Sequence, residues 1–186
     1  MAYGFIPIGG IDGRPYNGAT KRCVVVGGDT TDIYPGDFVR YTGTGDDFGA
    51  PSVTKVAAGE VIFGAVVSVE PNVASGDRTY VLGSVTTDQY VNVAIATDGM
   101  LFKCNPSAAA AKTSIGLNAD ISVTAGAAPY YTSKSSLDVG ATGTATAQLN
   151  IVGFLDNGTA LTSTSADLVV RVAEPQIGAA TLSVGV

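Results

Sequence analysis

Hydrophobic and polar residues alternate along several short stretches of the chain. In the stretch QYVNVAI, which begins at residue 89, Val91, Val93 and Ile95 fall on one face of an extended strand. Asp98-Gly99 follows, and residues 100–104 form another mainly apolar run. Because glycine accepts the positive φ of a tight turn, this arrangement predicts a β-hairpin.

The same pattern recurs from residue 21 to the C-terminal third of the chain. Tyr34-Pro35-Gly36-Asp37 predicts a turn, and the continuous apolar run 61–69 is typical of a strand buried on both faces. Only residues 107–112 (SAAAAK) favour a helix, and six residues are too few for a stable one. The chain is therefore expected to be all-β, a β-barrel or β-sandwich with little helix. The other expected strands lie within residues 23–26, 38–42, 79–85, 116–123, 149–155 and 168–173.

The first twenty residues differ from the rest. They contain five glycines and two prolines among apolar side chains, which excludes a regular helix. They are also too apolar for a solvated tail. We therefore expect an extended N-terminal arm (residues 1–20) that lies either on its own domain or on a neighbouring subunit, followed by one all-β domain (residues 21–186).

Charge is scarce and acidic in balance. Charged residues make up 14% of the chain and the formal net charge is −6. The basic residues are scattered singly, apart from Lys21-Arg22, so nucleic-acid binding is not expected. With 46% hydrophobic residues the chain is not of the disordered type. Low charge favours a compact β-fold or a surface covered by neighbouring molecules.

The residue types needed for common catalytic sites are missing or poorly arranged. The chain has no histidine, which removes Ser-His-Asp and Cys-His nucleophile pairs and imidazole zinc ligands. Carboxylate pairs of the glycosidase type remain, but the chain has no tryptophan for a sugar platform. We expect no enzyme activity, cofactor site or metal site. The alternative calcium ligands are Asp29, Asp32 and Asp37, or Asp46 and Asp47, although aspartates at such positions usually form turns.

Cys23 and Cys104 both lie in or beside expected strands. We expect small buried thiols, with a disulfide as the open alternative. Residues 1–10 lack the features of a signal peptide, and the run 61–69 is too short to span a bilayer, so no membrane association is expected.

The order of several segments gives a further indication. Taken together, they resemble the capsid cement (decoration) proteins of tailed bacteriophages. The matching segments are PYNGA (15–19), IYPGDFV (33–39), AGEVIFGAVVSVEP (58–71), Arg78-Thr79-Tyr80, residues 89–93 with 98–102, GLNAD (116–120), LNIVGFL (149–155) and LVVRVAEPQ (168–176). Two departures are Asp98-Gly99, where an Asp-Pro turn is expected, and the apolar tail 177–186.

This resemblance implies a β-barrel or sandwich that forms a homo-oligomer, expected to be a trimer, at threefold junctions between capsomers. The implied partner is the major capsid protein, and the implied location is the outer capsid surface of a virion made in the host bacterial cytoplasm. There the protein would stabilise the shell against packed DNA. No catalytic residues come with the family.

Aromatic residues and arginine dominate interface hot spots. Our hypothesis is therefore that the arm carries much of the grip on capsid or neighbour, and that the outer face of the 89–95 strand, with Tyr90, packs on a sister subunit. The alternatives are another virion subunit, such as a head fibre, spike or host-surface-binding protein, and an enzyme or carbohydrate-binding module. The candidate interface residues are Tyr3, Phe5, Ile6, Arg14, Tyr16 and Asn17.

Overall fold

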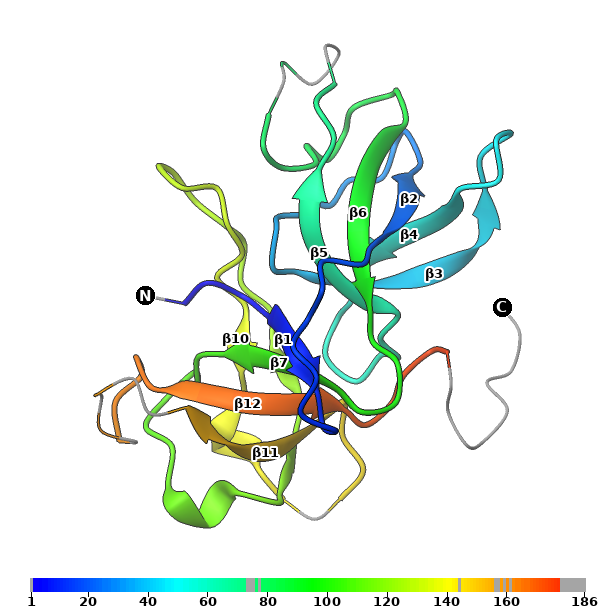
Figure 1. The fold of residues 1–186 in the computed structure, drawn as a ribbon. Coiled ribbons are helices and arrows are strands. Elements are labelled where there is room, and N and C mark those ends of the chain that lie inside the picture. Colours follow the sequence, from blue (N-terminus) through cyan, green and yellow to red (C-terminus); the bar gives the residue numbers. More distant parts are fainter. Residues whose placement is uncertain are drawn as a thin grey trace.

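The chain folds into a small closed β-barrel and a five-stranded antiparallel sheet that packs against it (Figure 1). The computed structural model describes residues 2–72, 76, 78–143, 145–155, 158, 160 and 162–177. The expected all-β class is confirmed. Within the described residues, helical turns are confined to two three-residue 3₁₀ segments, η2 (Lys112–Ser114) and η3 (Val139–Ala141).

The barrel consists of five strands in the order β2-β4-β3-β5-β6, and it closes where β6 pairs with β2. Its interior is filled by small branched side chains around Phe63, because alternate residues of each strand point inward. The strands are β2 (Lys21–Val25), β3 (Phe38–Gly45), β4 (Pro51–Lys55), β5 (Gly64–Val69) and β6 (Gln89–Ile95).

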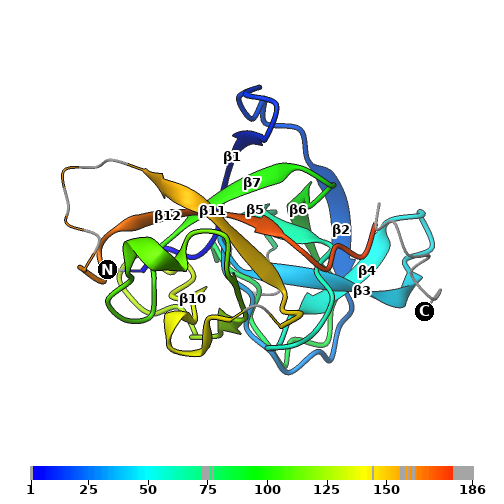
Figure 2. The same ribbon diagram turned by 90° about the horizontal axis from the view of Figure 1, so that it is seen from below.

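The second sheet has the order β1-β7-β12-β11-β8, and all its pairs are antiparallel. A separate two-stranded sheet, β9 (Ile121–Ser122) with β10 (Ser136–Leu137), lies beside it. In Figure 2, seen from below, the ribbons of β11 and β12 cross over the barrel strands. The strands of the larger sheet are β1 (Ile6–Gly10), β7 (Met100–Cys104), β8 (Asn118–Ala119), β11 (Leu149–Leu155) and β12 (Asp167–Val172).

A second hydrophobic core joins the sheet to the outside of the barrel. Phe38 at the start of β3 stacks on Phe5, with ring centroids 4.2 Å apart, and meets Phe102 of β7 edge-on at 5.2 Å. Buried Gln148, just before β11 of the sheet, connects the sheet to the barrel through hydrogen bonds. Its Nε2 donates to the carbonyls of Ala57 (2.9 Å) and Glu60 (2.6 Å) in the β4–β5 connection.

The hairpin predicted for residues 89–104 is wrong. The expected inward face of β6 is right, since Val91 and Val93 are in the barrel core. However, β6 pairs with β2 and β5 in the barrel, whereas β7 pairs with β1 and β12 in the other sheet. The Asp98-Gly99 turn, with Gly99 at φ 85°, therefore connects the two sheets rather than two neighbouring strands.

Three other local predictions need correction. Residues 79–85 form no strand and contribute only the bridge between Val81 and Ile33. Residues 107–111 are irregular, and the helical turn is limited to η2. The run 61–69 is buried on both faces only over residues 62–66. Val61 is exposed before it, and Val67 reaches solvent where β5 shifts register between Val66 and Ser68. Of the apolar tail 177–186, only Ile177 is among the described residues.

Candidate interaction surface

The N-terminal segment makes a tight reversal after β1. Gly10 N–H donates to the Arg14 carbonyl (2.8 Å), and Tyr16 N–H donates to the Ile8 carbonyl (3.0 Å). Ile11 N–H donates to the Gly99 carbonyl (2.8 Å), which fixes the reversal against the β6–β7 turn. Hydrogen bonds within the segment and to the β6–β7 turn thus hold the exposed loop at the end of the expected arm.

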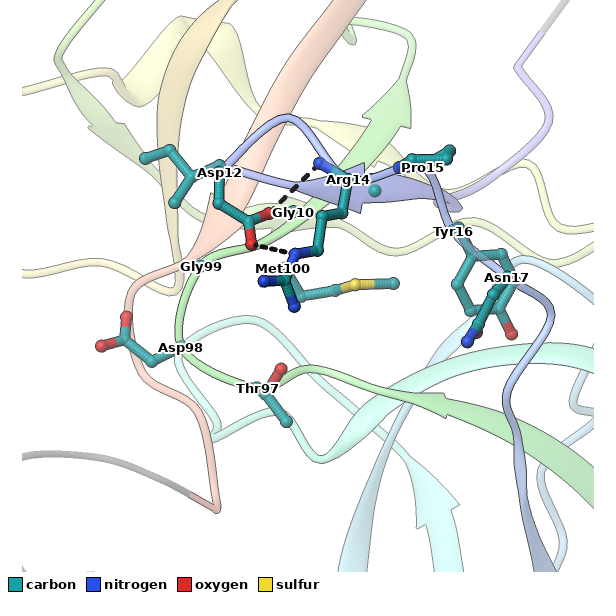
Figure 3. A pocket seen from close by; sticks show the side chains of 12 residues that line it. Gly10, Asp12, Arg14, Pro15, Tyr16, Asn17, Thr97, Asp98, Gly99 and Met100 are labelled. Atoms are coloured by element: carbon teal, nitrogen blue, oxygen red, sulfur yellow. Dashed lines mark hydrogen bonds and ion pairs between the residues drawn. The ribbon is translucent and has the colours of Figure 1, made fainter.

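A pocket of about 440 Å³ lies between this loop and the β6–β7 turn (Figure 3). Figure 3 shows Asp12 and Arg14 on one side of it and Thr97 and Asp98 on the other. The Arg14 side chain is 87% exposed, and its Nε lies 3.1 Å from Asp12 Oδ2. We call this the Arg14 pocket. Its arrangement can bind a partner through one guanidinium, two carboxylates and the neighbouring apolar side chains.

A second, mainly apolar cavity of about 310 Å³ adjoins the Arg14 pocket. The two share the lining residues Tyr16, Asn17, Thr97 and Met100. We call it the Tyr16 cavity. The Tyr16 hydroxyl donates to the Ala19 carbonyl (2.8 Å), and Ala19 N–H donates to Asn17 Oδ1 (3.0 Å), so its outer wall is ordered. Its lining residues are Tyr16, Asn17, Ala19, Thr20, Ile95, Thr97 and Met100.

The six residues proposed from the sequence do not form one surface. Arg14, Tyr16 and Asn17 come together at these two hollows. Ile6 is partly exposed beside a separate apolar hollow of about 280 Å³, which Tyr3 and Phe5 also line.

Phe5 is 1% exposed and belongs to the core, so its side chain is not available for direct contact with a partner. The Tyr3 hydroxyl donates to Asp167 of β12, and β1 pairs with β7 of the same chain. The sequence left open whether the arm lies on its own domain or on a neighbouring subunit. In the structure, residues 3–10 lie on their own domain. Burial raises the pKa of Tyr3, and its hydrogen bond to Asp167 raises it further.

A buried polar cluster joins the turn before β3, and β4, to the segment between β9 and β10. Lys55 Nζ lies 2.8 Å from Asp37 Oδ2, and the hydroxyls of Ser133 (2.6 Å) and Ser135 (3.2 Å) donate to Asp37 Oδ1. The Lys55 side chain is 8% exposed and that of Asp37 0%. A lysine beside two serines has the groups of a nucleophilic pair, but this burial leaves no room for a substrate. The cluster is a structural clasp.

Asp29 and Asp32, which were also considered as calcium ligands, make hydrogen bonds within the chain. Asp29 accepts from Thr31 N–H and the Thr54 hydroxyl, and Asp32 accepts from the Tyr34 hydroxyl and Gly83 N–H. Within the described part of the chain, no group of three or more His, Cys, Asp or Glu side chains is placed to hold a metal ion. These aspartates shape the loops they occupy.

Both cysteines are fully buried and unpaired, one in β2 and one in β7. This confirms the expectation of small buried thiols. Burial raises the pKa of Cys23 to about 12, and it also raises the pKa of Cys104.

Neither thiol should therefore react with an aromatic disulfide reagent in the native state. We expect no rapid release of chromophore at pH 8 and two equivalents per chain after denaturation, because only the thiolate attacks and burial disfavours it. Two equivalents released from the native protein within minutes would contradict the burial.

Sequence reasoning missed the interactions on the outer face of β6. The Arg22 guanidinium stacks on the Tyr90 ring at 3.6 Å and forms a bidentate pair with Glu70, with Nε–Oε1 at 2.9 Å. The Tyr90 hydroxyl donates to Asp46 Oδ2 (2.9 Å). Tyr90, which we expected to pack on a sister subunit, thus already has partners in its own chain.

Asp46 accepts from Phe48 N–H (3.0 Å) and Ala50 N–H (2.7 Å), which fixes the β3–β4 turn. Desolvation acts to raise the pKa of Asp46, but the hydrogen bonds from Ala50, Tyr90 and Phe48 together lower it. The turn spacing of Asp46 was visible in the sequence, whereas its contact with Tyr90 joins distant segments.

Comparisons with protein-family models, curated proteins and solved structures find no match for this chain. No helix among the described residues is long and apolar enough to cross a membrane.

Proposed function

We propose that this protein is a structural capsid cement (decoration) protein of a tailed bacteriophage. It binds the major capsid protein on the outer surface of the head at junctions between capsomers. There it stabilises the shell against packed DNA. It is not an enzyme, and it acts as a homo-oligomer, with a trimer the expected state.

The observation that carries this proposal is the exposed loop 11–19, which presents Arg14, Tyr16 and Asn17 around two adjoining hollows. The loop contains the PYNGA segment, the first of the segments whose order resembles cement proteins. Arginine and tyrosine are the side chains that most often dominate binding energy at protein interfaces. On a shell, many copies bind at once, so modest contacts at each loop are sufficient.

The direct test is co-sedimentation of the purified protein with capsids that lack it. We expect saturable binding in hundreds of copies per head, and an increase in the pressure or temperature at which full heads lose DNA. A handful of copies at one vertex would instead indicate a fibre or spike. No binding to capsids, combined with binding to glycans, would contradict the proposal.

Replacing Arg14 by alanine should weaken capsid binding about tenfold or more, because a hot-spot arginine contributes on the order of 2 kcal/mol. The fold should be unaffected, since the Arg14 side chain is 87% exposed. The measurement is the dissociation constant from co-sedimentation. Tyr130→Ala is the matched control, because Tyr130 is exposed and lines none of the three hollows described here. Equal loss in both variants would remove the loop from the capsid interface.

A further inference from the structure

The β3–β4 turn displays an exposed aromatic side chain. Phe48 is 89% exposed, although phenylalanine is among the residues most often buried. In Figure 1 the turn projects away from the rest of the molecule, beyond the ends of β3 and β4. An isolated exposed apolar residue is not unusual in itself. What distinguishes Phe48 is how firmly its backbone is held.

Three hydrogen bonds hold the turn together, and a contact with Tyr90 fixes it to the barrel. Asp46 accepts from the N–H groups of Phe48 and Ala50, and Gly49 N–H donates to the Asp46 carbonyl (3.1 Å). The Tyr90 hydroxyl anchors Asp46 from β6, and Arg22 stacks on the Tyr90 ring. A side chain presented on an ordered backbone loses little entropy on binding, which favours a specific contact.

The same chain contains a hollow that suits a phenyl ring. The Tyr16 cavity has a volume of about 310 Å³, and its mainly apolar lining includes Tyr16, Ile95 and Met100. A cavity of roughly 150 Å³ is enough to hold benzene. The Tyr16 cavity therefore has room for the ring of Phe48 and part of its backbone.

One pair of charges at the two features is complementary. Asp47 is exposed beside Phe48, and exposed Lys21 directly follows Thr20 of the cavity wall. Arg14 lies in the adjoining pocket, which also contains Asp12 and Asp98. The Tyr16 cavity itself is lined by no carboxylate. Asp47 can thus approach Lys21 when Phe48 enters the cavity.

The two features cannot meet within one chain. Val39 of β3 and Ile95 of β6 both pair with Gly64 of β5. In the strand register, Ile95 in the cavity wall is therefore at the same height as the start of β3. From Val39, β3 continues six residues to Gly45, about 20 Å, before the turn begins. The partner must be another molecule.

We propose that Phe48 of one copy of this chain inserts into the Tyr16 cavity of a second copy. The contact is heterologous, because each copy uses its turn on one side and its cavity on the other. Repeated around a rotation axis, such a contact closes into a ring. This inference rests on the self-association that the proposed function includes, and it names the surfaces that produce it. In the oligomer the Tyr16 cavity is occupied by the second copy, so the Arg14 pocket is the hollow that remains for the capsid protein.

The first experiment is sedimentation velocity of the full chain without capsids, over a range of concentrations. We expect a closed oligomer for the wild type and for Tyr130→Ser, and a dissociation constant at least tenfold higher for Phe48→Ser. Ala19→Trp, which fills the cavity from its wall, should have the same effect. Asp47→Lys should weaken the oligomer, and adding Lys21→Glu should restore it.

A disulfide experiment tests the contact itself. Phe48→Cys and Ala19→Cys proteins are mixed and oxidised. We expect a disulfide between residues 48 and 19 of two molecules, which cannot form when either variant is oxidised by itself. The native cysteines do not interfere, because both are buried.

A monomeric wild type, or an oligomer unchanged by Phe48→Ser, would overturn the inference. So would a Phe48→Ser protein that loses capsid binding while its oligomer persists, because Phe48 would then contact the capsid protein. The proposed function fails separately, if an intact oligomer does not bind capsids. Arg14→Ala, which alters only the adjoining pocket, should keep the oligomer.

Discussion

Replacing Lys55 by methionine should lower the free energy of unfolding by about 3–5 kcal/mol, because the change leaves a buried carboxylate without its countercharge. Asp37 has a 0% exposed side chain and lies 2.8 Å from Lys55 Nζ. The remaining partners of Asp37 are two serine hydroxyls and Tyr34 N–H, which supply hydrogen bonds but no positive charge. Methionine keeps the shape of the lysine stem, so lost packing adds little.

The measurement is urea unfolding of both proteins at neutral pH. Lys112→Met is the matched control, since Lys112 is exposed and the change should stay within about 0.5 kcal/mol. A double variant, Asp37→Leu with Lys55→Met, should be more stable than Lys55→Met alone, because no buried charge remains. A change below about 1 kcal/mol for Lys55→Met would mean that water reaches the pair in solution.

The second large effect concerns Phe5. Replacing Phe5 by alanine should destabilise the fold by about 3–5 kcal/mol, the usual cost of deleting a buried aromatic ring. Phe5 is 1% exposed, stacks on Phe38, and donates its backbone N–H to the Gly36 carbonyl (2.8 Å). The ring thus holds the N-terminal segment at the junction of barrel and sheet.

Thermal or urea unfolding measures this effect, and Ile6→Ala is the control in the same strand. Ile6 is 40% exposed, so its truncation should cost no more than about 1 kcal/mol. Equal losses for the two variants would mean that Phe5 is not packed as described. Because deletion of residues 1–18 would remove both β1 and Phe5, point variants such as Arg14→Ala separate binding from folding better than truncation.

Part of the candidate interaction surface was predictable from the sequence. Arg14, Tyr16 and Asn17 lie between glycines in a segment that cannot form a helix, and the structure places them at the two hollows. The hypothesis from the sequence includes Phe5 because aromatic residues often dominate interface hot spots. Its burial depends on Phe38 and Phe102, which are distant in sequence.

The sequence by itself determined the fold class and the faces of single strands. Alternation with period two places Val91 and Val93 inside whichever sheet contains β6, because successive side chains point to opposite faces. Glycine and proline mark the turns, as at Gly36 with φ 93°. The sequence also determined, through its lack of histidine, that Ser-His-Asp and Cys-His pairs cannot form.

Only the tertiary structure decided which strands are neighbours. The Asp98-Gly99 turn has the same local chemistry whether it joins two paired strands or two sheets. The choice depends on β7 pairing with β1 and β12, and on β6 pairing with β2 and β5, in place of the pairing of β6 with β7. Such pairing energies come from residues far apart in the chain, which local patterns do not encode. The same is true of the Asp37–Lys55 clasp, the firmly held Phe48 and the Tyr16 cavity: each is built from segments that only folding brings together.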